Sequence, residues 1–196
     1  MIETLVAFAG GYALGSIPFA YLVTRFFGLG DIRQVGSGNV GTTNVLRTGN
    51  KLATAFTLIG DVGKGVLAVI IGQYFGPWTA MAAGLGAFTG HIFPVWLNFK
   101  GGKGFATYLG ILAVLNLPVA LLTGATWIAS TLIWRMSSLA TLVSAAVSPL
   151  YMLLIAPWIY AMGSAILAVL IFVTHRENIK RILGNQEPRI GEKKPS

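Results

Sequence analysis

Three long stretches of the sequence carry no formally charged side chain, and this feature limits the fold more than any other. They are residues 65–99, 104–134 and 136–174. Uninterrupted apolar runs of more than about 18 residues are typical of transmembrane helices. Only 10% of the residues are charged and 55% are hydrophobic, whereas a soluble domain usually has roughly a quarter charged residues. The sequence therefore predicts an all-α, polytopic membrane helix bundle.

Charges and helix-breaking residues divide these stretches into about seven predicted transmembrane helices. Lys103 and Arg135 flank the middle run, and if both face the cytoplasm the chain between them must cross the membrane an even number of times. We therefore expect two helices there, hinged at Asn116, and two more in the last run, divided near Pro157. The predicted spans are residues 5–27, 52–75 and 78–99, with two spans within 104–134 and two within 136–174.

The distribution of basic residues predicts an external N-terminus and a cytoplasmic C-terminus. With that orientation all of the 14 Lys and Arg residues except Lys64 lie on the cytoplasmic side, in agreement with the positive-inside rule. Cytoplasmic loops and contact with anionic lipid headgroups then account for the net charge of +8, and no nucleic-acid partner is expected. We expect one membrane domain over residues 1–184 and a short polar cytoplasmic tail over residues 185–196.

The first of three long polar segments, residues 31–50, has the composition of an anion-binding loop. It contains a G-x-G-x-x-G spacing, but a membrane helix precedes it, so the spacing does not indicate a Rossmann fold. Glycines leave backbone N–H groups accessible, and a helix starting near Gly41 would direct its positive end at an anion. Arg47 adds a planar fork for a phosphate, unless the segment is only a glycine-rich loop with an interfacial arginine. The other candidate ligands are Gly36, Ser37, Gly38, Asn39, Thr43 and Asn44.

The second polar segment, residues 91–107, brings lysines and glycines to the start of a predicted helix. It is not a Walker A loop, because a glycine follows the second lysine where Ser or Thr would bind magnesium. Glycines and two lysines at a helix start predict a phosphate site, whereas lysines that snorkel from membrane spans are the alternative. The candidates are Lys100, Gly101, Gly102, Lys103, Gly104 and, within the helix, Thr107.

The third polar segment, residues 175–187, continues the last span into water. His175 and Asn178 are three residues apart and share one helix face. His175 is therefore either a general base or a polar residue at a membrane exit. All three polar segments fall on the predicted cytoplasmic face, and this convergence defines the candidate site.

Asp61, Lys64 and His91 are ionisable residues that lie inside predicted spans, away from the charged span ends. Asp61 and Lys64 are about one helical turn apart, and we expect a structural ion pair between them. His91 is expected to bond a neighbouring helix rather than a substrate.

Several reaction classes are excluded by what the sequence lacks. The absence of cysteine removes disulfides, thiolate nucleophiles and cysteine-ligated metals. There is no G-x-S-x-G nucleophile elbow, and neither histidine has an Asp five positions on, so the His-x₄-Asp catalytic dyad is missing as well. With two histidines and no H-E-x-x-H motif, we predict neither a metal nor another cofactor.

In several motifs, spread in order over nearly the whole chain, the sequence resembles the PlsY family of bacterial, acyl-phosphate-dependent glycerol-3-phosphate acyltransferases. The motifs are Gly15-Ser-Ile-Pro18, Gly36-Ser-Gly-Asn39 with Thr43-Asn44 and Arg47, Asp61-Val-Gly-Lys64-Gly65, Gly90-His-Ile-Phe-Pro94, Lys100-Gly-Gly-Lys-Gly104 with Thr107, and His175-Arg-Glu-Asn178.

The resemblance implies transfer of a fatty acyl group from acyl phosphate to the sn-1 hydroxyl of glycerol 3-phosphate at the bacterial inner membrane. It further implies that Ser37, Arg47, His175 and Asn178 are catalytic, that Gly101–Gly104 bind glycerol 3-phosphate and that Glu187 is structural. The enzyme that makes acyl phosphate is the expected functional partner. A transporter for organic phosphate anions is the alternative, although the short, uncharged external turns do not favour it.

Overall fold

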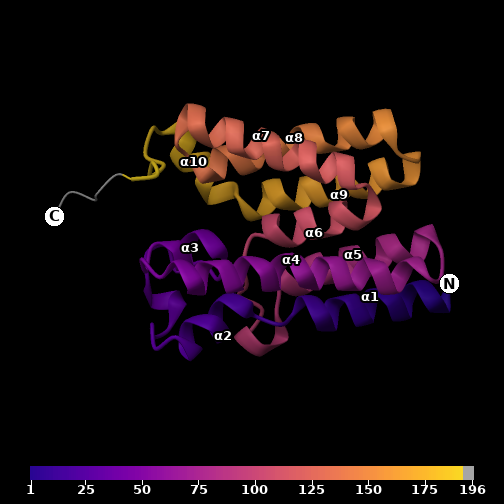
Figure 1. Cartoon of the computed structure of the whole chain (residues 1–196), viewed down its shortest axis with the longest axis horizontal. Coiled ribbons are helices and arrows are strands. Elements are labelled where there is room, and N and C mark those ends of the chain that lie inside the picture. The colour runs from indigo at the N-terminus through magenta and orange to yellow at the C-terminus, as the bar shows by residue number, and fades with distance from the viewer. Residues whose placement is uncertain (192–196) are drawn as a thin grey trace. The chain divides into compact units, whose positions relative to one another are not determined.

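The computed structural model describes residues 1–191, and every regular element in that range is a helix (Figure 1). The chain divides into two compact units, unit 1 from Met1 to Leu115 and unit 2 from Asn116 onward. Unit 1 contains α1 (Ile2–Gly15), α2 (Phe19–Phe26), η1 (Ile32–Gln34), α3 (Thr42–Leu46), α4 (Lys51–Gln73), α5 (Pro77–Ile92), η2 (Val95–Leu97) and α6 (Phe105–Leu115). Unit 2 contains α7 (Leu117–Trp134), α8 (Ser137–Ile155), α9 (Trp158–Thr174) and α10 (Arg176–Leu183). The predicted all-α class is confirmed.

Most helix boundaries coincide with the predicted breaking residues. Gly76 has a φ of 106°, which glycine adopts without strain, and Pro77 takes the first position of α5. The run 104–134 is divided as predicted, because the side chain of Asn116 caps α7 by accepting a hydrogen bond from the N–H of Val119 at 3.1 Å. Pro157 separates α8 from α9.

The first predicted span, in contrast, is not one continuous helix. α1 ends at Gly15 and α2 begins at Phe19, with Ser16, Ile17 and Pro18 between them. Pro18 has no backbone N–H, and its ring clashes with the preceding turn of a continuing helix. Neighbouring backbone groups bond several carbonyls at this break, since Ile17 donates to Leu14, Phe19 donates to Ile17 and Leu22 donates to Pro18.

Within residues 1–191, five segments are long and apolar enough to cross a membrane, and the bent pair α9 and α10 makes a sixth candidate. The five are Ile2–Phe26, Lys51–Gln73, Pro77–Leu97, Leu117–Trp134 and Ser137–Ile155. α6 is apolar but has only 11 residues, which at about 1.5 Å per residue spans roughly half of a hydrocarbon core of about 30 Å. The helical membrane class is confirmed, whereas seven crossings with an external N-terminus stay a prediction.

Glycines bring α1 and α5 into backbone contact. Gly11 and Gly15 on α1, and Gly86 and Gly90 on α5, are each four residues apart and therefore lie on one helix face. A Cβ atom at any of the four would overlap a backbone carbonyl of the other helix. Small residues at this spacing are how membrane helices approach closely without a hydrophobic driving force. α4 lies against both helices and against α6, which completes the core of unit 1.

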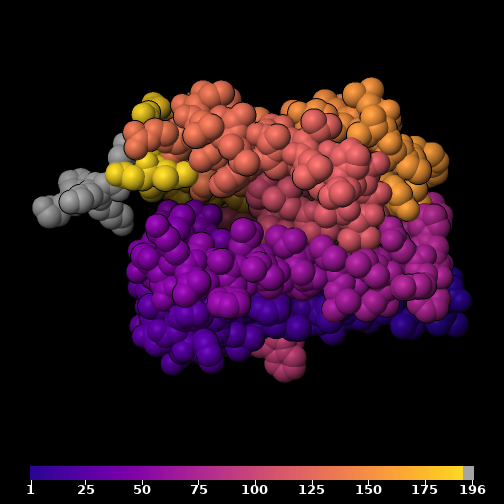
Figure 2. Space-filling view, in the orientation of Figure 1, coloured from indigo at the N-terminus to yellow at the C-terminus, as the bar shows by residue number. Residues whose placement is uncertain are grey.

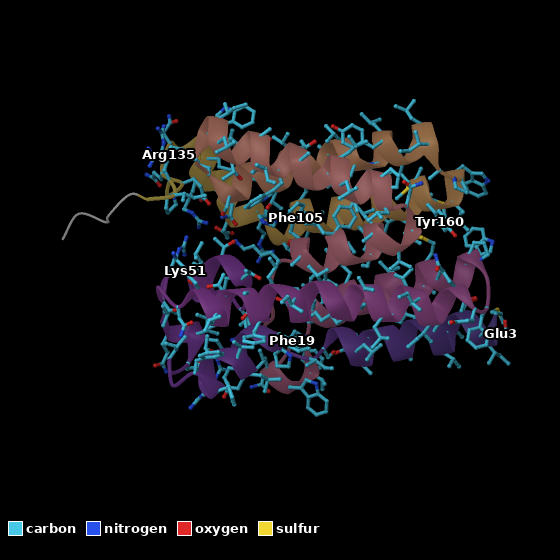
Figure 3. The ribbon with its side chains drawn as sticks, in the orientation of Figure 1. Glu3, Phe19, Lys51, Phe105, Arg135 and Tyr160 are labelled. Carbon is cyan, nitrogen blue, oxygen red and sulfur yellow. The ribbon has the colours of Figure 1, made fainter. Side chains whose placement is uncertain are left out.

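With one exception in unit 1, the polar connections of each unit lie toward one end (Figure 1). In unit 1, Glu3 and Lys51 lie at opposite ends, and α2, η1 and α3 are grouped with the Lys51 end (Figures 1 and 3). In unit 2, Arg135 and Tyr160 lie at opposite ends (Figure 3). The connection between α5 and α6 instead stands out from the surface of unit 1 around η2, where Trp96 is largely exposed (Figure 2).

Candidate functional site

Asn44 organises the first polar segment from inside. Its side chain is almost fully buried, and its amide group donates hydrogen bonds to the carbonyl oxygens of Ile32 at 3.1 Å and Val35 at 2.9 Å. Its Oδ1 atom accepts a hydrogen bond from the backbone N–H of Ser37 at 3.1 Å and another from Arg47 Nη1 at 3.5 Å. The prediction that Asn44 donates to a substrate anion is therefore wrong, because both of its amide hydrogens are used within the loop. Asn44 positions Ser37 and Arg47 instead.

Two glycines shape the backbone around Ser37. Gly36 and Gly38 have φ values of 57° and 70°, in the left-handed region that side chains with a Cβ rarely adopt. A Cβ at Gly36 would also lie 2.5 Å from Asn44 Oδ1. Both glycines thus serve the loop conformation, and the exposed Ser37 between them is presented to solvent.

The predicted helix near Gly41 is present but short. α3 has five residues, so its dipole contributes little to an anion site, contrary to the expectation from the sequence. Thr43 and Arg47 are exposed on or beside this helix, and Asn39 is half-buried. The polar side chains, rather than the helix terminus, are therefore the groups of this segment that an anion can reach.

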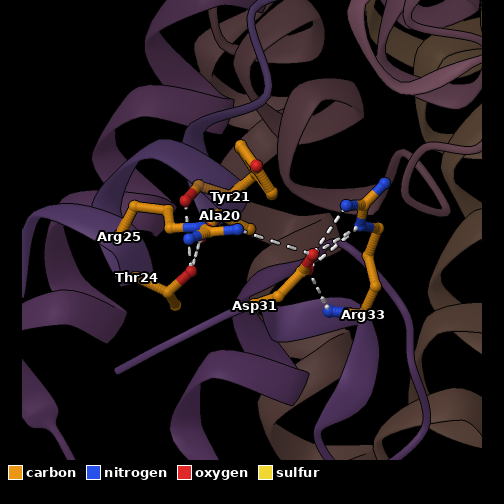
Figure 4. A network of polar contacts seen from close by, with 6 residues as sticks. All are labelled: Ala20, Tyr21, Thr24, Arg25, Asp31 and Arg33. Carbon is orange, nitrogen blue, oxygen red and sulfur yellow. Dashed lines mark hydrogen bonds and ion pairs between the residues drawn. The ribbon is translucent and has the colours of Figure 1, made fainter. Parts of the chain in front are cut away.

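A network that the sequence analysis missed ties the start of the first segment to α2 (Figure 4). Asp31 accepts hydrogen bonds from the backbone N–H and the guanidinium of Arg33, and Arg25 lies 3.9 Å away. Both guanidinium groups stack over the ring of Tyr21, at 5.4 Å for Arg25 and 5.2 Å for Arg33. The hydrogen bonds from Arg33 lower the pKa of Asp31 to about 2. No periodic pattern marks this cluster, because a turn of the chain creates it.

The glycines of the second polar segment fix the loop to the end of α5. Gly101 donates its backbone hydrogen bond to the carbonyl of Ile92 at 2.9 Å, and Gly102 donates to the carbonyl of His91 at 3.0 Å. These two N–H groups are therefore not available to a phosphate, which corrects the predicted backbone cradle. A Cβ at Gly102 would overlap the imidazole of His91 and lie 2.6 Å from the carbonyl oxygen of Val40. The first and second polar segments thus meet at Val40 and Gly102.

The remaining candidates of the second segment differ in exposure. Lys100 is exposed and Lys103 is half-buried. Gly104 has a φ of 89°, and a Cβ there would overlap the ring of Phe88. Thr107 is fully buried against α4, and its hydroxyl has no hydrogen-bond partner in the described range. Direct contact between Thr107 and a substrate is therefore not supported.

Asp61, Lys64 and His91 form one cluster in unit 1. Lys64 Nζ lies 2.8 Å from Asp61 Oδ1, as their spacing on α4 predicts. His91 Nδ1 on α5 lies 3.4 Å from the same carboxylate oxygen, and so contacts a neighbouring helix as expected. Lys64 also donates a hydrogen bond to the carbonyl of Ile17 at 3.1 Å, at the break between α1 and α2.

His175 lies in unit 2, where α9 ends. Its Nδ1 atom is 2.8 Å from the carbonyl oxygen of Ile171, and its side chain is buried. A carbonyl can only accept, so Nδ1 carries the proton, and in the neutral imidazole Nε2 is the basic nitrogen. With Nδ1 as the donor, Nε2 is the nitrogen of the neutral His175 imidazole that accepts hydrogen bonds.

Glu187 holds Asn178 in place. Its carboxylate accepts hydrogen bonds from Asn178 Nδ2 at 2.6 Å, Ser138 Oγ at 2.6 Å and Arg181 Nε at 2.7 Å. Burial raises the pKa of Glu187, but these three hydrogen bonds outweigh it and the net pKa is lowered. Glu187 is thus the structural hub of the third polar segment.

The first part of the predicted polar tail is bound to unit 2. Besides Glu187, Ile190 accepts a hydrogen bond from Arg135 Nη2 at 3.0 Å and donates its backbone N–H to the carbonyl of Arg135. Lys193 and Lys194, which we place in the cytoplasmic tail, lie outside the described residues. Of the three predicted polar segments, the first two belong to unit 1 and the third belongs to unit 2.

The fold defines the class of the protein as a helical integral membrane protein. A family model described as "Glycerol-3-phosphate acyltransferase" matches residues 5–185. Proteins of that name in Caulobacter vibrioides and Mesorhizobium japonicum are 51% and 50% identical over 97% and 96% of this chain, and the matches cover 89% and 97% of those proteins. The chain therefore belongs to the PlsY family of glycerol-3-phosphate acyltransferases.

Two crystal structures of PlsY, described as an integral membrane glycerol 3-phosphate acyltransferase, share this fold. The glycerol 3-phosphate form superposes with a TM-score of 0.90 at 35% identity, covering 96% of both chains. The lysophosphatidic acid form gives a TM-score of 0.89 at 34% identity, covering 96% of this chain and 95% of the other.

Proposed function

We propose that this protein transfers a fatty acyl group from acyl phosphate to the sn-1 hydroxyl of glycerol 3-phosphate, giving lysophosphatidic acid and inorganic phosphate. The observation that carries the proposal is the match to the acyltransferase family over residues 5–185, together with basic side chains on two adjoining polar segments of unit 1. We place the reaction at the cytoplasmic side of the bacterial inner membrane, where an enzyme that makes acyl phosphate supplies the donor.

Acyl phosphate needs no covalent intermediate with the protein. It is a mixed anhydride, and its phosphate is a good leaving group. The sn-1 oxygen forms a bond to the acyl carbonyl carbon, and the bond from that carbon to the phosphate oxygen breaks, with the electron pair leaving on phosphate. The protein has to bind two phosphate-bearing substrates, neutralise charge and accept the hydroxyl proton.

We assign phosphate binding to Arg47, Ser37 and the two lysines Lys100 and Lys103. Arg47 and Ser37 both hydrogen-bond to Asn44 Oδ1, which holds them in one arrangement before substrate arrives. A planar guanidinium can donate two parallel hydrogen bonds to a phosphate. Thr43 and Asn39 are further donors of the same segment.

We propose that Nε2 of His175 accepts the proton of the sn-1 hydroxyl. The hydrogen bond between its Nδ1 atom and the carbonyl of Ile171 leaves Nε2 as the acceptor nitrogen. Asn178, which Glu187 holds through its amide group, is the accompanying polar residue of the third segment. A substrate phosphate oxygen is the competing proton acceptor, and the pH profile of a His175 variant distinguishes the two.

The deciding experiment is a reaction with the purified protein in lipid nanodiscs. Glycerol 3-phosphate is supplied with acyl phosphate in one arm and with acyl-CoA in the other. We expect lysophosphatidic acid acylated at sn-1 and an equal amount of phosphate with acyl phosphate only. Equal or faster turnover of acyl-CoA contradicts the proposed donor, and uptake of labelled glycerol 3-phosphate into sealed vesicles without product supports the transporter alternative.

A further inference from the structure

The family resemblance implies that Gly101–Gly104 bind glycerol 3-phosphate, and this loop packs against buried ionisable side chains in the middle of unit 1. The side chains of Asp61 and Lys64 are each 2% exposed, and that of His91 is 6% exposed. Burying an ion pair in an apolar environment requires desolvation, so such pairs contribute little net stability compared with apolar residues of similar volume. Stability by itself therefore does not explain why three ionisable side chains occupy this position.

One end of the cluster supports the break between α1 and α2. Lys64 Nζ donates to the carbonyl of Ile17 at this break, and the backbone N–H of Phe19 donates to the same oxygen at 3.1 Å. The ammonium also lies 5.9 Å from the ring centre of Phe19. Lys64 thus adds a donor from α4 to a carbonyl that lies outside a regular helix, and this bond joins α4 to the break.

The other end of the cluster sets the position of the glycine loop. Asp61 contacts His91 Nδ1, which orients the imidazole. That imidazole lies against Gly102 so closely that no Cβ fits there, and the backbone carbonyl of His91 accepts the hydrogen bond from Gly102. The imidazole and the backbone carbonyl of His91 thus together fix the position of Gly102.

The cluster acts on the loop and not on the substrate. The cavity between them is lined by Ser16, Lys64, His91 and Gly102 and has a volume of about 10 Å³, room for one water molecule. Sites for small organic molecules usually have volumes of roughly 300–1,000 Å³. Glycerol 3-phosphate does not fit in this cavity.

We propose that Asp61, Lys64 and His91 are positioning residues for glycerol 3-phosphate, which act by holding Gly101 and Gly102 at the end of α5. The inference rests on the proposed function. Changes in this cluster should therefore raise the KM for glycerol 3-phosphate and leave the KM for the acyl donor nearly unchanged. The cluster contacts the loop that carries Lys100 and Lys103 at Gly102, through His91.

The first test compares the two KM values in a variant that leaves no unpaired buried charge. Asp61→Asn with Lys64→Met removes both charges, and we expect the KM for glycerol 3-phosphate to rise roughly 10-fold while the KM for acyl phosphate changes less than about twofold. Thr57→Val is the matched control, because Thr57 is buried one turn earlier on α4 and bonds only its own helix. The control should leave both values and the melting temperature unchanged.

The second test is a double-mutant cycle between His91→Ala and Gly102→Ala. Because the new methyl group meets the imidazole, the rise in the KM for glycerol 3-phosphate caused by Gly102→Ala should shrink at least about threefold once the imidazole is removed. The contact with the Val40 carbonyl remains, so the recovery is partial. If the variant with both Asp61 and Lys64 replaced does not fold, this cycle alone tests whether His91 positions Gly102.

Equal changes in both KM values, or independent effects of His91→Ala and Gly102→Ala, overturn the inference. Wild-type protein in the same assay separates this result from a failure of the proposed function. If wild-type protein acylates glycerol 3-phosphate and the variants show no KM split, only the positioning role is wrong. If wild-type protein forms no lysophosphatidic acid from acyl phosphate, the proposed function itself is wrong, and the inference that rests on it falls with it.

Discussion

Replacing Asn44 with Asp tests whether one buried amide holds the proposed phosphate-binding loop. The two side chains have nearly the same shape, and Asp keeps the oxygen that accepts from Ser37 and Arg47. The change replaces the amide nitrogen, which donates to the carbonyls of Ile32 and Val35, with an oxygen that cannot donate. Two hydrogen bonds are lost, and three oxygens then face one another at distances near 3 Å.

The expected magnitude follows from the burial of this group. A net hydrogen bond contributes about 1 kcal/mol, and a buried acceptor left without a donor is unfavourable by about 1–3 kcal/mol. Because Asn44 is 1% exposed, water does not replace the lost donors, and the ordered loop should lose about 2–4 kcal/mol. A shift of that size changes the ratio of ordered to disordered loop roughly 30- to 700-fold.

Two measurements read out this loss. Trypsin cleavage after the exposed Arg33 and Arg47 should become faster, and kcat/KM with acyl phosphate should fall, while the melting temperature of the whole protein changes little because the opening is local. Asn50→Asp is the matched control, since Asn50 caps α4 through its side-chain oxygen, which Asp retains. Unchanged proteolysis, with kcat/KM for Asn44→Asp within threefold of wild type, refutes the role given to Asn44.

Four further predictions follow from the same geometry. Arg47→Lys should lower kcat/KM roughly 30- to 1,000-fold because the bidentate fork is lost, and turnover within threefold of wild type would reduce Arg47 to an interfacial charge. His175→Ala should lower kcat more than it raises KM and should remove the acidic limb of the kcat profile; if the limb persists near pH 6, the second pKa of a phosphate monoester (about 6), the substrate is the base. For Glu187, the folded-state pKa lies below the ordinary 4.5, so its stabilising effect is present above that pH and is lost as pH falls through the folded pKa. Glu187→Gln should therefore lower the melting temperature at pH 7 and flatten its decline in acid, and an unchanged acid profile contradicts this. Cysteines introduced beside Lys103 and Arg135 should both resist an impermeant thiol reagent in intact cells, whereas labelling of one alone breaks the seven-span topology.

The positions of the helices follow from local features of the sequence. Uncharged runs, the Gly76-Pro77 pair, the capping side chain of Asn116 and the ring of Pro157 all act within one or two turns of the chain, so their effect is visible without any tertiary contact. The Asp61–Lys64 pair is also local, because residues three apart on a helix are neighbours. Three of the motifs that identify the family, at residues 36–47, 100–107 and 175–178, lie in the polar segments, where residue types are dictated by chemistry more than by packing.

Tertiary structure decided what the polar groups are used for. Composition marked Asn44, Gly101 and Gly102 as hydrogen-bond donors to an anion, but each donates to a carbonyl of the protein instead. A donor's partner depends on which carbonyl the fold brings within 3 Å, and no spacing in the sequence encodes that.

The hydrogen-bond partner of Lys64 likewise could not be predicted from the sequence, because the two residues are far apart in the chain. It is the carbonyl of Ile17, 47 residues earlier in the chain. The sequence has a proline after Ile17 and a lysine in an apolar helix, and each residue is unusual inside a predicted membrane span. Only the packing of α4 beside the break between α1 and α2 pairs the two, because it brings the ammonium of Lys64 within hydrogen-bond distance of the Ile17 carbonyl.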